Sequence, residues 1–119
     1  MQHKQADRLP TFVASDGCVL AEVIHPAGGQ TSPGVSLSRA MLGPGAATRP
    51  HRLDFLEIYY VLRGQGVMHV DQESQAVGPE SCVYLPPGAV QWLENPGSEE
   101  LVFLCVCHPA WRAEGDHPA

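Results

Sequence analysis

The segment RPHRLDFLEIYYVLRGQG, residues 49–66, decides the fold of this chain. Its second half is a run of aliphatic and aromatic residues, 58–62, that ends at Gly64 and Gly66. This composition is typical of a buried β-strand that is closed by a turn. Glu57 begins the strand, and a carboxylate there is costly unless it is paired or coordinates a ligand. His51 precedes it, so the segment raises the question of what these two side chains do together.

The rest of the chain continues this pattern of short apolar runs. Eleven prolines and twelve glycines divide the 119 residues, and no stretch shows a convincing helical period. These features predict an all-β sandwich or barrel that forms a single domain over residues 1–119. The expected strands are residues 18–24, 35–42, 57–62, 67–70, 82–85, 91–94 and 101–106. Turn signals such as HPAGGQTSPG (25–34) and DQES (71–74) separate them, and the polar residues 112–119 are expected to be a mobile tail.

The amino-acid composition argues against some classes of binding partner. The net charge of −6 comes from 13 acidic and 7 scattered basic residues, which argues against a nucleic acid or a membrane surface as partner. No apolar run approaches the roughly 20 residues of a membrane-spanning helix. The four cysteines form no CxxC pair, and the first residues lack the apolar core of a signal peptide. We therefore expect reduced thiols and a cytoplasmic location.

Two motifs resemble those of the cupin family. Gly45, His51, Glu57 and Gly64 match the first cupin motif, G-x5-H-x-H-x3-E-x6-G, except that Leu53 replaces its second histidine. Residues 86–95, PPGAVQWLEN, resemble the second motif, P-x-G-x2-H-x3-N, with Gln91 at the histidine position. The resemblance covers residues 35–107 and is strongest to a subgroup of small single-domain cupins in which Leu and Gln replace these two histidines.

The resemblance implies a cupin double-stranded β-barrel of the jelly-roll type, whose interior holds a metal and a small ligand. Carried over residue by residue, it predicts a divalent metal, Zn, Ni, Fe or Mn, bound by His51, Glu57 and Gln91. The alternative is a buried polar network in which Glu57 accepts hydrogen bonds from His51 and Gln91 without any metal.

Other residues are proposed for the ligand pocket. Tyr59 shares strand parity with Glu57, and Leu53 occupies a ligand position that it cannot fill with a donor. His69 on the strand VMHV offers an imidazole, and Arg39 offers a cation for an anionic substrate. The cysteines at 105 and 107 are expected to be inert buried thiols.

Two functions from different classes follow. The first is a metal-dependent enzyme of isomerase, lyase or dioxygenase type that acts on a small polar organic molecule. The second is a module that binds or senses a small molecule without turnover. We expect a homodimer in either case, since short barrels often cover apolar surface by pairing.

Overall fold

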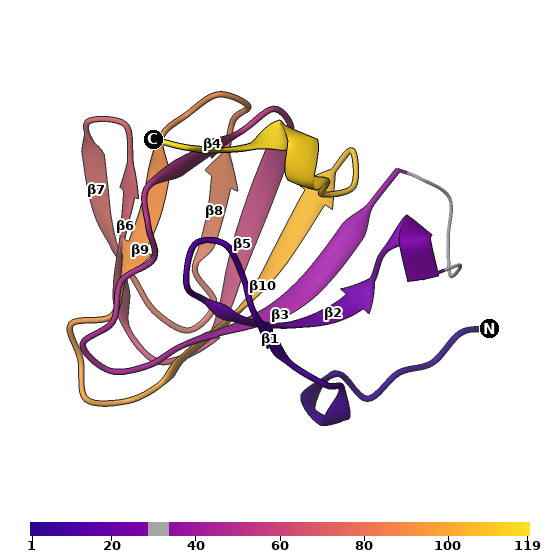
Figure 1. The fold of residues 1–119 in the computed structure, drawn as a ribbon. Coiled ribbons are helices and arrows are strands. Elements are labelled where there is room, and N and C mark those ends of the chain that lie inside the picture. Colours follow the sequence, from indigo (N-terminus) through magenta and orange to yellow (C-terminus); the bar gives the residue numbers. More distant parts are fainter. Residues whose placement is uncertain (29–33) are drawn as a thin grey trace.

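The computed structural model describes residues 1–28 and 34–119 and contains two antiparallel β-sheets that face each other (Figure 1). The strands of the six-stranded sheet are, in spatial order, β1 (Phe12–Val13), β2 (Val19–Ile24), β3 (Ser36–Leu42), β10 (Leu101–His108), β5 (Leu56–Arg63) and β8 (Cys82–Leu85). Those of the five-stranded sheet are β11 (Asp116–Pro118), β4 (His51–Leu53), β9 (Gln91–Glu94), β6 (Gly66–Val70) and β7 (Glu73–Val77). Three short 3-10 helices, η1 (Ala6–Arg8), η2 (Pro26–Gly28) and η3 (Ala113–Gly115), complete the described elements. The all-β jelly-roll prediction is confirmed.

The seven expected strands correspond to β2, β3, β5, β6, β8, β9 and β10. In the expected turn HPAGGQTSPG, residues 29–33 lie outside the described part of the chain. The expected turn DQES is shorter than predicted, because Glu73 and Ser74 already belong to β7 and pair with β6.

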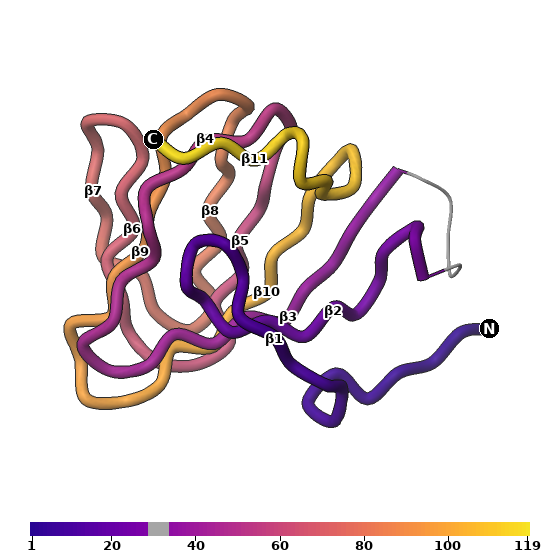
Figure 2. Tube along the Cα trace, in the orientation of Figure 1, coloured from indigo at the N-terminus to yellow at the C-terminus, as the bar shows by residue number. Residues whose placement is uncertain are grey.

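The C-terminal residues 112–119, which we expected to be a mobile tail, form η3 and β11 instead. β11 pairs with β4 in the register Asp116 to Leu53 and Pro118 to His51, and the tube in Figure 2 shows this segment lying along β4. Two further contacts hold the segment: Arg112 lies over the ring of Phe55, 5.3 Å from its centroid, and the Asp54 amide donates to the Gly115 carbonyl. The polar sequence gave no sign of this pairing, because the hydrogen bonds of a strand come from its backbone.

The hydrophobic core fills the space between the sheets. Inward-facing residues of the six-stranded sheet, Leu42, Val61 and Leu101, meet Met68 and Leu93 of the other sheet, and all five are at most 3% exposed. Alternation along each strand puts one side chain in two into this layer. Within the described residues, no helix has the length and apolar character needed to cross a membrane.

Gly64 makes the turn after β5 possible. Its φ of +89° lies in the left-handed region, and a Cβ at this position would come within 2.5 Å of the Glu100 carbonyl oxygen. Only glycine fits both demands, so the last residue of the first motif has a structural role.

Candidate functional site

A cavity of about 200 Å³ lies inside the barrel next to the core. Tyr59 and Phe103 belong both to the core and to the cavity wall, with ring centroids 4.9 Å apart. His51 and Leu53 enter the wall from β4, and Glu57 enters it from β5. The first motif thus supplies an imidazole and a carboxyl group to this wall.

Glu57 is held by two donors. The Gln91 Nε2 atom donates to its Oε1 at 2.6 Å, and the Cys107 thiol donates to its Oε2 at 3.3 Å. Gln91 comes from β9 of the facing sheet, whereas Cys107 is the neighbour of Glu57 on β10. The carboxyl group, 7% exposed, therefore bridges the two sheets.

Burial changes the protonation of this group. Removal from water raises the pKa of Glu57 from 4.5 to about 7, although the hydrogen bonds from Gln91 and Cys107 and the nearby His51 act in the opposite direction. The carboxyl therefore exchanges its proton near neutral pH, which is common for groups that act as acid or base catalysts.

His51 is oriented by the backbone. Its Nδ1 lies 3.0 Å from the Arg49 carbonyl oxygen, so Nδ1 carries the proton and Nε2 remains an acceptor. The ring is buried and lines the cavity, and His51 pairs with Gln91 between β4 and β9. The imidazole can therefore accept a hydrogen bond from a ligand or bind a cation through Nε2.

The donor set suits a resident divalent metal poorly. The described residues contain no group of three His, Cys, Asp or Glu side chains placed to hold a metal ion. Gln91, expected as a third metal ligand, turns its amide nitrogen toward Glu57, and both carboxyl oxygens of Glu57 already accept hydrogen bonds. This arrangement matches the alternative polar network for Gln91, whereas His51, the other expected donor, contacts the Arg49 carbonyl oxygen and Cys107 is an unforeseen partner of Glu57.

Two of the four expected pocket residues, Tyr59 and Leu53, do line the cavity. Removal from water raises the pKa of Tyr59 well above its usual value, so the phenol keeps its proton and can serve as a hydrogen-bond donor. Leu53, 2% exposed, presents hydrocarbon where the motif usually has an imidazole.

The other two expected pocket residues lie outside the cavity wall. His69 stacks on Trp92 with centroids 3.6 Å apart, and its ring nitrogens contact Glu94 and Ser74 at 2.9 and 2.8 Å. It is Met68, its neighbour on β6, that points into the core. Both faces of the strand VMHV carry apolar side chains, so the sequence did not reveal which face is internal.

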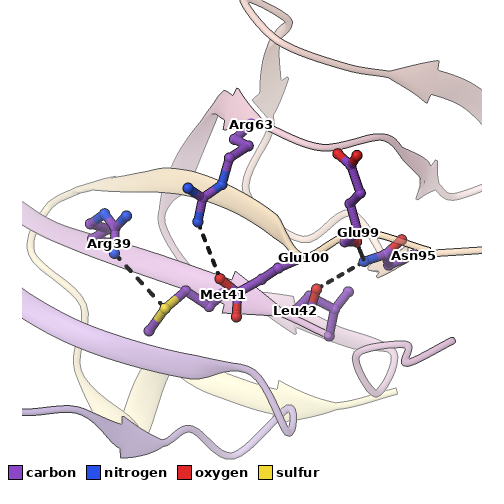
Figure 3. A network of polar contacts seen from close by, with 7 residues as sticks. All are labelled: Arg39, Met41, Leu42, Arg63, Asn95, Glu99 and Glu100. Carbon is purple, nitrogen blue, oxygen red and sulfur yellow. Dashed lines mark hydrogen bonds and ion pairs between the residues drawn. The ribbon is translucent and has the colours of Figure 1, made fainter. Parts of the chain in front are cut away.

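Arg39 is likewise separate from the cavity. Its guanidinium contacts the Met41 sulfur at 3.8 Å, in the group of residues shown in Figure 3. Ser36 and Ser38, which precede it on the other face of β3, line the cavity instead. Strand alternation turns Arg39 away from the wall, so it does not line the pocket as expected, and its contact with an anionic substrate at the barrel mouth stays a prediction.

The sequence analysis missed the residues from the two ends of the chain. Phe12 and Val13 from β1 line the cavity together with Trp111 and Asp116. The carboxylate of Asp116 accepts hydrogen bonds from Trp111 Nε1 at 3.0 Å and from Ser15 Oγ at 3.4 Å. The contact between Ser15 and Asp116 joins residues 101 positions apart, so no local sequence pattern recorded it.

The geometry agrees with the comparisons. The family model of the cupin domain (Cupin_2) matches residues 38–107, and the chain belongs to this family. It is 32% identical over 111 residues to Uncharacterized protein MJ1618 of Methanocaldococcus jannaschii, a match that covers 91% of this chain and 86% of that one.

Two further similarities are more distant. The Oxalate-binding protein of Thermotoga maritima is 31% identical over 70 residues, which cover 58% of each chain. The structure of the polyketide cyclase RemF from Streptomyces resistomycificus superimposes with a TM-score of 0.85 at 18% identity, covering 100% of this chain and 85% of that one. At this identity, the likeness to RemF shows the fold.

Proposed function

We propose that this cupin binds a small organic molecule in its cavity and that Glu57 exchanges a proton with the molecule, as in an isomerase or lyase reaction. The observation that carries the proposal is a buried carboxyl group in the cavity wall whose pKa, about 7, suits both proton donation and acceptance at neutral pH. The polyketide cyclase RemF, a protein of the same fold, fits an enzymatic role for such a barrel.

Each side chain has a defined part in this proposal. Gln91 and Cys107 fix the orientation of the Glu57 carboxyl, so that one of its oxygens can take a proton from carbon next to a carbonyl group. The Tyr59 hydroxyl then donates a hydrogen bond to the carbonyl oxygen as negative charge develops on it. Leu53 adds buried hydrocarbon to the wall, and a less polar environment strengthens these interactions.

The reaction class is tested by solvent exchange. A panel of small ketones and phenols would be incubated in D₂O with the wild-type protein, with Glu57→Gln and with Cys82→Ser, an exposed position that serves as control. We expect NMR to show deuterium incorporation by the wild type and the control, and its loss in Glu57→Gln. A ligand that binds all three proteins without exchange would contradict proton transfer and favour the binding or sensing role.

A divalent metal remains a prediction for this site, with Zn, Ni, Fe or Mn as the ions and with His51 and Glu57 as ligands. His51 favours it, since its Nε2 is an acceptor in the cavity wall. If loaded, the metal would supply Lewis acidity or dioxygen chemistry. Elemental analysis of the untagged protein and of His51→Ala and Glu57→Ala decides the point: near-stoichiometric metal that both variants lose would replace the metal-free proposal.

Homodimer formation and a cytoplasmic location complete the proposal. The outer face of the six-stranded sheet carries exposed Leu62 and Tyr84 beside half-buried Ile58 and Leu104, a surface that a second copy would cover. Light scattering of the wild type and Leu104→Glu tests the dimer, and a monomeric wild type would refute it. The four free cysteines agree with a reducing compartment, which cell fractionation tests.

A further inference from the structure

We infer that the cavity accepts a molecule with a single ring and one hydroxyl or carbonyl group, and that it discriminates against anions. This inference rests on the proposed role of the cavity as a binding site. It concerns the class of ligand and goes beyond the proton transfer assigned to Glu57.

The charged side chains of the cavity wall disfavour an anionic ligand. Asp16, Glu22 and Asp116 line the cavity together with Glu57, whereas the described lining residues include no lysine or arginine. Asp16 accepts a hydrogen bond from the Cys18 amide at 3.0 Å, so its charge has a fixed place in the wall. An anion entering the cavity would lose its hydration beside these carboxylates without gaining a counter-charge.

The nearby arginine does not supply that counter-charge. Arg49 donates from its guanidinium to the Ser15 carbonyl oxygen at 2.8 Å and is not among the residues of the wall. Arg39 contacts Met41 on β3, as described above. A carboxylate or phosphate group therefore meets no lysine or arginine among the described residues of the wall.

The size and shape of the cavity suit a ligand with a single ring. A dry protein cavity of roughly 150 Å³ is large enough for benzene, and the volume here is about 200 Å³. Tyr59 and Phe103 are inclined by 45° to each other, so they offer ring faces and edges to an aromatic guest. The available space thus corresponds to one ring with small substituents.

The polar groups of the cavity wall can form hydrogen bonds with a ligand. The His51 Nε2 atom accepts a hydrogen bond, and the Tyr59 hydroxyl of the same wall donates one. A hydroxyl or carbonyl group on the ring complements this set, whereas a wholly apolar ring would leave it unsatisfied.

Three matched probes test the inference: 4-methylphenol, 4-methylbenzoate and 4-methylbenzylamine, which share a ring and differ in charge. Their dissociation constants would be measured at pH 7 by titration calorimetry and by ligand-observed NMR. We expect 4-methylphenol to bind most tightly and 4-methylbenzoate to bind at least about tenfold more weakly. Equal or tighter binding of the benzoate, tightest binding of the amine, or no binding of any probe would overturn the inference. Oxalate is a further anionic probe, and binding of it more tightly than the phenol would also overturn the inference.

Two variants distinguish the effect of charges in the cavity wall from the effect of the protein's overall negative charge. Glu22→Lys places a cation in the wall and is expected to reduce the preference for phenol over benzoate by about tenfold. Glu99→Lys makes the same change of charge on an exposed loop and should leave the preference unchanged. Equal effects of the two variants would show that overall charge sets the preference and would refute the inference.

A cavity-filling variant distinguishes failure of this inference from failure of the proposed function. Ser38→Phe occupies space in the wall, and with its fold checked by circular dichroism it should lose all binding of 4-methylphenol. Probe binding that survives Ser38→Phe would locate the ligand elsewhere and refute the proposed function. Benzoate binding that is as tight as phenol binding and that Ser38→Phe abolishes would refute only the ligand class.

Discussion

Replacing Glu57 by glutamine tests the electrostatic state of the cavity directly. The carboxyl is 7% exposed, and its burial raises its pKa from 4.5 to about 7. Glutamine has nearly the same shape, and its amide oxygen can still accept the hydrogen bond from Gln91. The substitution therefore removes the charge while it keeps the packing.

The size of the effect follows from the two pKa values. Between pH 4.5 and about 7 the folded protein keeps a proton that the unfolded chain releases, so Glu57 lowers the free energy of unfolding as the pH rises through this window. At about 1.4 kcal/mol per pKa unit, ionised Glu57 costs the fold about 3 kcal/mol above pH 7. Relative to the wild type, Glu57→Gln should be about equally stable at pH 4.5 and about 3 kcal/mol more stable at pH 8.

Urea unfolding followed by circular dichroism at several pH values from 4.5 to 8, with and without EDTA, measures this difference. Other carboxylates titrate alike in both proteins, so their contributions cancel in the comparison. A difference that does not change with pH would refute the raised pKa. A difference of opposite sign, in which the wild type becomes relatively more stable as the pH rises, would mean that Glu57 is ionised in the folded protein. If EDTA abolishes that difference, a bound metal is its cause.

Three further predictions concern the frame around the cavity. Gly64→Ala should cost about 2–4 kcal/mol of unfolding free energy in urea titrations, because its Cβ would meet the Glu100 carbonyl oxygen, whereas Gly43→Ala, with no atom within 4 Å, should change it by less than about 1 kcal/mol. His69→Ala should lower stability by about 1 kcal/mol and leave the calorimetric affinity for 4-methylphenol unchanged; a loss of affinity would return His69 to the site. Asp116→Ala should speed amide hydrogen exchange in β11, and unchanged exchange would show that its contacts with Trp111 and Ser15 do not hold the segment.

The sequence predicted the strands that have apolar side chains on at least one face. The elements that it missed are short or polar: β4 has three residues, and β7, from Glu73 to Val77, buries only its last side chain. Such strands are specified by the backbone partners that surround them rather than by their own composition. For the same reason β11 was mistaken for a loose end.

Motif spacing was sufficient to bring His51, Glu57 and Gln91 together, because the turns and strand lengths of the fold fix their relative positions. It did not determine which faces of β3 and β6 are internal. His69 was misplaced because both faces of its strand are apolar, and Arg39 because Ser36 and Ser38, on the internal face of β3, carry no hydrophobic signal. The register across a sheet resolves these ambiguities, and it depends on residues distant in sequence.

The two replaced histidines have a common consequence for Glu57. Gln91 donates a hydrogen bond to the carboxyl, so it satisfies one of the oxygens that a metal would otherwise engage. Leu53 packs with Cys107, the second donor to Glu57, and supplies hydrocarbon in place of an imidazole. A less polar wall favours the neutral carboxyl, and two lost donors weaken metal binding. The same pair of substitutions therefore moves this site toward proton exchange by the protein's own carboxyl group, which is the chemistry that we propose for it.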